Sequence, residues 1–206
     1  RDPEMSRGLG DVYKRQIFKV VIKISRFDRA YMRSYKINPQ SEKEFFDCVN
    51  DIYFSEEVQG LALYEQHLDI NRLQHITSVA YLSYLICKKM GWDFVSATRG
   101  AVLHDLFYYD WHEKDASHRL HGYRHPGFAL KNAEALCGDK LNDLEREVIR
   151  RHMWPLTPTP PMKKEAFVVS MCDKYCATKE LIVSMVPKQA QRFHRETGIV
   201  PTRPKA

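Results

Sequence analysis

The chain has 206 residues, a formal net charge of +6, 44% hydrophobic residues and 28% charged residues, which is ordinary for a soluble protein with one sizeable core. It contains no run of about 20 apolar residues and no signal-peptide pattern, and its five cysteines lack paired spacing. Unpaired cysteines indicate a reducing compartment, so we expect a cytoplasmic protein that does not bind a membrane. Acidic residues interrupt every basic stretch, so we do not expect nucleic acid as a partner.

Residues 1–16 are interpreted as a non-native, adapter-derived segment. Residues 11–16 spell the hexapeptide that one reading frame of a library-preparation adapter encodes. The alternative is a genuine N-terminus. In either case, the prediction of the fold begins at Ile17.

Helical spacing of apolar residues predicts one helix after another, so the expected fold class is all-α. Residues 17–58 are expected to form an N-terminal helical extension, in which Ser41 and Glu44 fit a capping box that opens a helix. No strand alternation persists in the sequence. The expected elements of this region are helices over residues 17–34, after Ser41 and over residues 56–66, followed by a connector over residues 67–71.

The helices that follow carry polar residues on or at the ends of apolar faces. A helix expected over residues 72–90 has His75 on its apolar face, and the next helix ends its apolar face with His104 and Asp105. The other expected boundaries are Gly91 and Asp93 between these helices, a loop over residues 109–124, a helix start at His125 and Pro126, a capping box of Asn142 and Glu145, a helix end at His152, and a basic tail over residues 188–206.

Six possible metal ligands are spread over roughly 100 residues of these helices. Imidazole and carboxylate groups without thiolate suit iron, manganese, zinc or magnesium. Two such ions about 3.5–4 Å apart can hold a phosphoryl group and activate water. A single histidine on an apolar face is usually a hydrogen-bonded core residue, but a chance series of six ligands is improbable. The six residues are His75, His104, Asp105, His125, His152 and Asp173.

The order of these residues resembles the HD-domain metal-dependent phosphohydrolase superfamily, over roughly residues 60–180. The pattern of that superfamily is a helical His, a His-Asp doublet at a helix end and a distal Asp, and two further histidines mark the members that hold two metals. The stretches around His152 and Asp173 look like a bacterial group described as HD-domain proteins. The resemblance implies an HD-domain-like helical bundle over residues 59–187.

The same resemblance implies the chemistry. Asp105 and His104 would be the catalytic residues, with Asp105 bridging two divalent ions (Mn, Fe, Zn or Mg). A metal-activated hydroxide would attack a small anionic substrate that contains phosphate: a nucleotide, a dinucleotide or another phosphomonoester or diester. One ion would be held by His75, His104 and Asp173, and the other by His125 and His152.

One position departs from the pattern of many superfamily members. Tyr108 stands where those members have a lysine, four residues after the histidine of the doublet, that helps to hold the substrate phosphate. Arg72, Arg124 and Lys174 are the candidate replacements, because a cationic side chain matches a phosphate. Each of the three fits a solvated surface charge equally well.

Neighbouring residues compete for some of these roles. His121 rivals His125 as a ligand, and Pro126 favours His125 because proline is common at the first helical position. Cys172 and Cys176 lie one helical turn apart beside Asp173. Since buried cysteine is common, packing is the favoured interpretation of both thiols.

Two alternative functions stay open. A few members of the superfamily use the same six ligands around two irons to cleave C–C or C–P bonds with oxygen, and the missing lysine keeps this alternative open. Other HD domains serve as non-catalytic sensors or binding modules after they have lost ligands. The presence of all six ligands in this sequence counts against the second alternative.

Overall fold

The computed structural model describes residues 26–67, 69–111 and 119–199, and this part of the chain is predominantly helical, so the all-α prediction is confirmed. The adapter-like residues 1–16 and the last residues of the chain lie outside the described part. The elements are a helical segment over residues 26–34, α2 (Lys43–Tyr53), α3 (Glu56–Gln59), the 3-10 helix η1 (Gly60–Leu63), β1 (Glu65–His67), β2 (Ile70–Asn71), α4 (Arg72–Met90), α5 (Phe94–Leu103), α6 (His121–Cys137), the 3-10 helix η3 (Gly138–Lys140), α7 (Asp143–Arg151), α8 (Lys164–Met185) and α9 (Pro187–Thr197).

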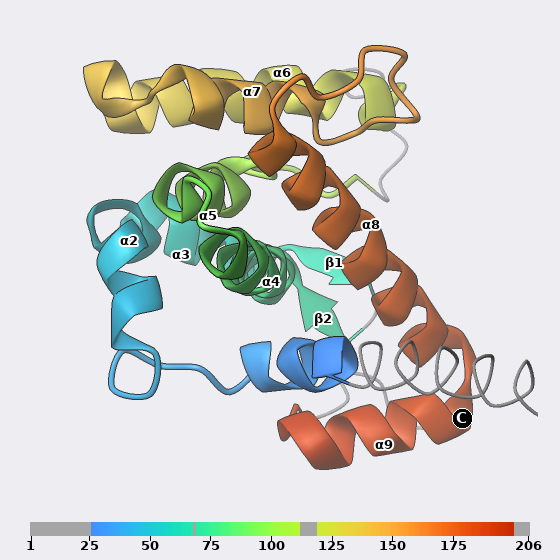
Figure 1. Ribbon diagram of the computed structural model, residues 1–206. Coiled ribbons are helices and arrows are strands. Elements are labelled where there is room, and N and C mark those ends of the chain that lie inside the picture. The colour runs from blue at the N-terminus through green and yellow to red at the C-terminus, as the bar shows by residue number, and fades with distance from the viewer. Residues whose placement is uncertain (1–25, 68, 112–118, 200–206) are drawn as a thin grey trace, which may run out of the picture.

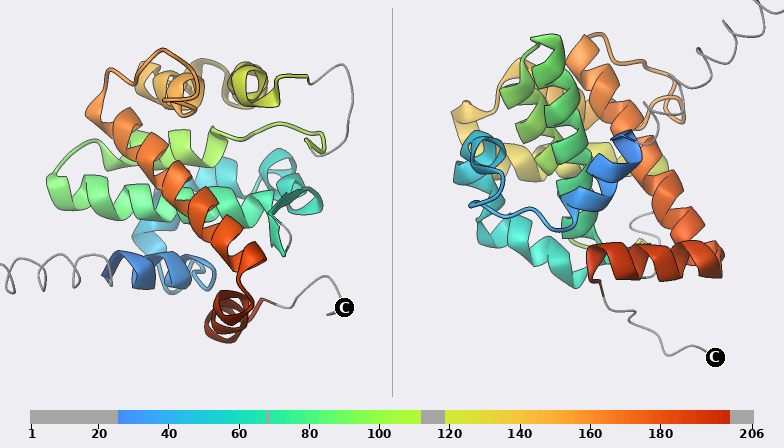
Figure 2. Two further views of the ribbon diagram at one scale, coloured as in Figure 1. Left: turned by 90° about the vertical axis from the view of Figure 1, so that its right-hand side faces the viewer. Right: turned by 60° about the horizontal axis from the view of Figure 1, so that its bottom comes forward.

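Helices α4 and α5 form the centre of the bundle. They pack against each other, α8 runs obliquely past α4, and α7 packs on α5 and α8 (Figure 1). Helices α6 and α7 lie at one end of the molecule and α9 lies at the other, as the turned views also show (Figure 2). None of the helices in the described part of the chain is both long enough and apolar enough to cross a membrane.

The described part of the N-terminal extension belongs to the same core as the central helices. Phe45 of α2 is fully buried, and its ring centroid lies 5.5 Å from that of Tyr81 and 5.7 Å from that of Tyr84, both on α4. Tyr35 packs edge-on against Phe193 of α9, with 4.9 Å between the ring centroids. One contiguous cluster of buried side chains therefore connects both ends of the described chain.

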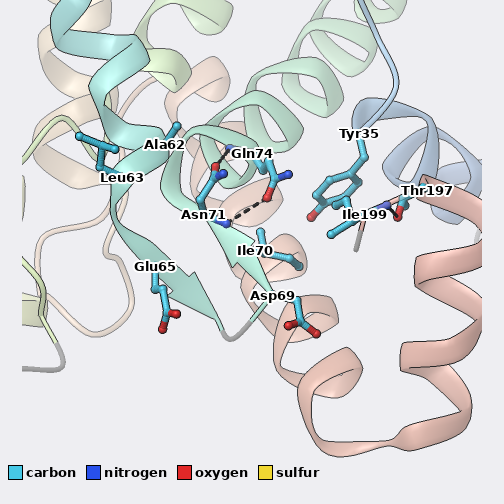
Figure 3. A pocket seen from close by; sticks show the side chains of 11 residues that line it. Tyr35, Ala62, Leu63, Glu65, Asp69, Ile70, Asn71, Gln74, Thr197 and Ile199 are labelled. Carbon is cyan, nitrogen blue, oxygen red and sulfur yellow. Dashed lines mark hydrogen bonds between the residues drawn. The ribbon is translucent and has the colours of Figure 1, made fainter. Parts of the chain in front are cut away.

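Several predicted helix boundaries are confirmed by their caps. Asn71 and Gln74 form a capping box at the start of α4 (Figure 3), and Asn142 and Glu145 form another at the start of α7. Gly91 ends α4 with a φ of 66°, a left-handed conformation that glycine adopts without steric cost. The side chain of Asp93 accepts a hydrogen bond from the backbone N–H of Ser96 and caps α5, as predicted.

The predictions for the segment before α4 were wrong in two places. Helix α2 begins at Lys43 without a side-chain cap, because Ser41 instead exchanges hydrogen bonds with Asn38 in a tight turn. Residues 56–66 do not form one helix. Helix α3 and η1 are short, and the chain then turns into a two-stranded antiparallel hairpin in which Glu65 pairs with Asn71.

Two boundaries in the C-terminal half also differ from the prediction. Helix α6 begins at His121 and contains Pro126, so proline does not mark its start. Pro126 is the sixth residue of α6 and has no backbone N–H, so the usual helical bond back to the carbonyl of Gly122 cannot form there. The expected basic tail contains α9, which has Pro187 at its first position and buries Phe193 against the 26–34 segment.

Candidate metal centre

The structure brings the six predicted ligands together in the interior. They come from the first turn of α4, the end of α5, α6, the end of α7 and the middle of α8. All six residues are buried, with exposed fractions between 0% and 7%. Histidine and aspartate are rarely buried without a partner, and six of them buried together make this cluster a candidate functional site. The residues are His75, His104, Asp105, His125, His152 and Asp173.

Two of the histidines are presented by the same local device. His104 follows the last residue of α5 and His152 follows the last residue of α7. In each ring Nδ1 donates to the carbonyl oxygen three residues earlier, at 2.7 Å for His104 and 2.8 Å for His152. Helix α5 was expected to continue through the doublet. The helix instead ends at Leu103, and the side chain of His104 folds back to bind the last turn of α5.

The distance between these two histidines depends on a close contact between α5 and α7. Gly100 precedes His104 by one turn, and Val148 precedes His152 by one turn. A Cβ atom at Gly100 would lie only 2.8 Å from Cβ of Val148. The absence of a side chain at Gly100 thus allows α5 and α7 to approach, and the two histidine rings lie 4.8 Å apart between their centroids.

All four histidines turn Nε2 toward the other ligands, because Nδ1 of each ring is held on the opposite side. Nδ1 of His125 lies 3.0 Å from the carbonyl oxygen of His121, and Nδ1 of His75 lies 2.9 Å from Oε2 of Glu180. Since a carbonyl oxygen can only accept, the Nδ1 atoms that face carbonyls carry the proton. The Nε2 lone pairs then point at the other ligands, which is the arrangement of metal-binding histidines.

One group of ligands gathers around Asp173. Its Oδ1 atom lies 3.2 Å from Nε2 of His75 and 3.8 Å from Nε2 of His104. The ligand atoms of these three residues all lie within 4.8 Å of one another. The group matches the first of the two ion sites expected from the sequence.

A second group gathers around Asp105, whose two oxygens face different histidines. Oδ2 lies 3.6 Å from Nε2 of His104, whereas Oδ1 lies 3.2 Å from Nε2 of His125 and 3.6 Å from Nε2 of His152. Asp105, His104 and His152 also have ligand atoms within 4.8 Å of one another. His104 therefore belongs to both groups, and Asp105 has the orientation that a bridging carboxylate needs.

The unsatisfied atoms of this cluster fit a bound cation. Nε2 of His125 and Nε2 of His152 are only 2.7 Å apart, although Nδ1 of each ring faces a carbonyl. Within the described chain, neither Nε2 of His104 nor Oδ1 of Asp105 has a hydrogen-bond partner. Buried polar atoms are normally paired. Two nitrogens bound to one ion at about 2.0–2.1 Å lie roughly 3 Å apart, so these residues can hold a metal ion.

The charges of the cluster are strongly coupled. Burial raises the pKa of Asp105, but His104, His125 and His152 outweigh that effect and hold the pKa well below its usual range. Burial, with His104 and His125 beside it, lowers the pKa of His152. The second group therefore combines an ionised carboxylate with a neutral imidazole, the protonation states in which both bind metals.

The first group has a different balance. Burial lowers the pKa of His75, but Glu180 and Asp173 on its two sides raise it well above the usual value. Burial raises the pKa of Asp173, but Lys174 and His75 hold it well below its usual value. Without an ion, a proton on His75 can thus compensate the two carboxylates.

A pocket of about 190 Å³ opens onto the cluster. Lys174 stands at its wall, where Nζ donates to Oδ2 of Asp173 at 2.7 Å and to the carbonyl oxygen of His152 at 2.8 Å. Its side chain keeps 28% exposure. The predicted substrate-binding role of Lys174 therefore fits its position. The lining residues are Gln66, Asp105, Trp111, His121, His125, His152, Met153, Asp173, Lys174 and Ala177.

Arg72 does not occupy the position expected of an anion clamp. It is fully buried, and its guanidinium donates to the backbone oxygens of Phe107 at 2.7 Å and Tyr109 at 3.2 Å, and to Gln66. The guanidinium also lies 3.6 Å from the centroid of the Phe107 ring. Because three of its five N–H donors bind protein acceptors and it does not line the pocket, Arg72 fixes the segment after the doublet.

The remaining candidates lie at the margin of the site. Arg124 is exposed on α6, 5.5 Å from the ring centroid of Phe128, and does not line the pocket. Tyr108 is 42% exposed. His121 lines the pocket, but its Nδ1 contacts the Tyr109 hydroxyl at 2.9 Å, and its ring stacks on His125 with 4.5 Å between centroids. The geometry favours His125 as the ligand, as predicted. The reason given for that prediction was wrong, because Pro126 does not mark the start of α6.

The two cysteines on α8 have the packing role that was favoured for them. Both are buried in the hydrophobic cluster, and neither belongs to the ligand groups found in the described chain. Burial raises the pKa of Cys172 to about 12 and raises that of Cys176 as well. Both thiols therefore stay protonated, which disfavours metal binding.

Sequence analysis missed two residues of the site. Gln66 donates to Oδ2 of Asp105 at 3.3 Å and accepts from Arg72, so it links the hairpin to the doublet. Glu180 contacts Nδ1 of His75 with both carboxylate oxygens. Glu180 follows Asp173 by seven residues and therefore shares its helix face, a signal that was available. No comparable signal marks Gln66.

Comparison of the chain with protein-family profiles, with curated proteins and with solved structures gives no match. The ligand groups and the pocket are therefore the basis for any functional conclusion.

Proposed function

We propose that this chain is an HD-domain metal-dependent phosphohydrolase, which hydrolyses a phosphate ester at a dinuclear centre. One observation carries the proposal: the Nε2 atoms of His125 and His152 face each other at 2.7 Å, beside the carboxylate of Asp105. With both rings neutral and protonated on Nδ1, two lone pairs would face each other there, and a cation bound by both nitrogens would remove that repulsion. The five free cysteines support a cytoplasmic location as part of the same proposal.

Each ligand has a role in this proposal. His75, His104 and Asp173 would hold one divalent ion, and His125 and His152 would hold the other on the Oδ1 side of Asp105. When bound, a pair of divalent ions polarises a phosphoryl oxygen and lowers the pKa of the attacking water. The carboxylate of Asp105 keeps the two halves in register, because its oxygens face different histidines.

The pocket wall supplies the contacts to the substrate. Lys174 would turn one of its three donors to a phosphate oxygen, while the carbonyl of His152 and the carboxylate of Asp173 hold its ammonium group in place. Trp111 and Met153 offer apolar surface for the part of the substrate that carries the phosphate. The substrate would be a nucleotide, a dinucleotide or another phosphomonoester or diester.

Metal analysis of the purified chain beside an Asp105→Ala variant tests the proposal. Protein purified without chelator is expected to carry about two ions per chain, and the variant is expected to lose them together with hydrolysis of a phosphomonoester and phosphodiester panel. Asp139→Ala is the matched control, because Asp139 is exposed in η3. Wild-type protein that binds no divalent metal would overturn the proposal.

An oxygenase is the second candidate function. It is favoured by Tyr108, which supplies no cation where many phosphohydrolases of the superfamily have lysine, and by the complete set of six ligands. Iron at two equivalents per chain together with oxygen consumption would decide for it. A non-catalytic sensor is less well supported, because every predicted ligand is present and faces the cluster.

A further inference from the structure

Glu180 is a buried carboxylate directly behind the candidate metal centre. It is 0% exposed and lies two helical turns after Asp173 on α8. Its two oxygens lie 3.0 Å and 2.9 Å from Nδ1 of His75, whose Nε2 atom faces Asp173 on the other side of the ring. The imidazole is thus held between two carboxylates of one helix.

A second group holds Glu180 itself. The hydroxyl of Tyr35 lies 3.2 Å from Oε1 of Glu180 and 2.9 Å from the hydroxyl of Tyr31. Tyr35 also reaches the wall of a separate hollow of about 470 Å³ between η1, the start of α4 and the end of α9 (Figure 3). A hydrogen-bonded chain therefore runs from that wall through Tyr35 and Glu180 to His75.

His75 differs in this respect from the other three histidines. Nδ1 of each of the other rings faces a neutral backbone carbonyl. A carboxylate on Nδ1 fixes the ring orientation and makes Nε2 a stronger donor to a metal than a carbonyl does. The two halves of the cluster are consequently unequal, although their visible ligands are similar.

We propose that Glu180 is a positioning residue for His75, which makes the half formed by His75, His104 and Asp173 the first and tighter of two ion sites. The proposal rests on the proposed metal centre. Tyr35 assists by holding Oε1, and the charge of Glu180 provides the larger contribution.

Titration of the metal-free chain with Mn²⁺ by calorimetry tests this. Wild-type protein is expected to show two binding events. Glu180→Gln preserves the shape and an acceptor oxygen but removes the charge, so the tighter constant is expected to weaken about 10- to 100-fold while the weaker constant is unchanged. Glu165→Gln is the matched control, because Glu165 is also buried on α8 but contacts the backbone of Asp93.

Tyr35→Phe keeps the carboxylate and provides a milder variant in case Glu180→Gln does not fold. It is expected to weaken the same constant about two- to ten-fold, the value of one hydrogen bond. Two ions bound by wild type with both constants unchanged in the variants would overturn the role of Glu180 alone. Equal weakening of both constants would also overturn it. A wild-type chain that binds no Mn²⁺ would overturn the metal centre itself.

Discussion

His125 and His152 direct their Nε2 atoms at each other across 2.7 Å, although α6 and α7 hold the opposite side of each ring by a backbone carbonyl. Neither ring can turn its protonated nitrogen inward without leaving that carbonyl unpaired. With both rings neutral, the pair is therefore poorly satisfied until both nitrogens bind a cation. Under the proposed metal centre, the stability of the protein is therefore expected to depend on bound metal.

Divalent metal is expected to raise the melting temperature. An ion present at 100 times its dissociation constant stabilises the folded state by about 2.7 kcal/mol, which corresponds to roughly 5–10 °C for a chain of this size. Thermal unfolding of chelator-treated protein with and without Mn²⁺ measures the shift. His152→Ala should abolish most of it. An equal shift in wild type and variant would show that the metal binds elsewhere.

Lys174→Ala is expected to lower kcat/KM for a phosphate ester by about 10- to 100-fold. A hydrogen bond to a charged group contributes about 1.5–3 kcal/mol, and the substituted side chain can no longer supply it. The metal content should change little, because Lys174 contacts Asp173 through the oxygen that faces away from His75. Lys188→Ala, on the exposed face of α9, is the control. Unchanged kinetics with intact metal would exclude Lys174 from substrate binding.

Arg72→Ala is expected to lower the free energy of unfolding by about 3 kcal/mol. The substitution leaves the buried carbonyl oxygen of Phe107 and the partly buried one of Tyr109 without the Arg72 donor, and the loss of a buried partner costs about 1–3 kcal/mol. Arg124→Ala, on the surface of α6, should change it by less than about 0.5 kcal/mol. Chemical denaturation of both variants gives the comparison. Similar values for the two would contradict the buried, structural position of Arg72.

Gly100→Ala is expected to destabilise the fold by about 1–3 kcal/mol, because its Cβ would push against Val148 at the contact of α5 and α7. The same push would separate His104 from His152, so metal affinity should fall as well. Gly127→Ala in α6 has open space around its Cβ and should instead stabilise by about 0.5–1 kcal/mol. Calorimetric melting shows whether the two signs are opposite.

The sequence predicted much of the site because its ligands stand next to local signals. The capping box of Asn142 and Glu145 was expected to open a helix that ends at His152, and His75 was expected on the apolar face of a helix over residues 72–90. These features depend on neighbours within one or two turns, which a single sequence contains.

Features that depend on distant partners could not be predicted in the same way. Arg72 resembled a phosphate clamp because its acceptors, the carbonyls of Phe107 and Tyr109, lie more than thirty residues away. The hairpin that carries Gln66 has strands of three and two residues, too short for an alternating pattern. Helix α9 was missed because Phe193 is its only buried hydrophobic residue.

The ring stack beside the pocket gives the molecule an optical probe of its own site. Trp111 lies nearly parallel to His121, with 5.6 Å between the ring centroids and an interplanar angle of 13°, and His121 stacks in turn on His125. Indole emission responds to the charge and motion of an adjacent imidazole. The chain has three tryptophans, and the part of its fluorescence that comes from Trp111 should report on what occupies the neighbourhood of His125.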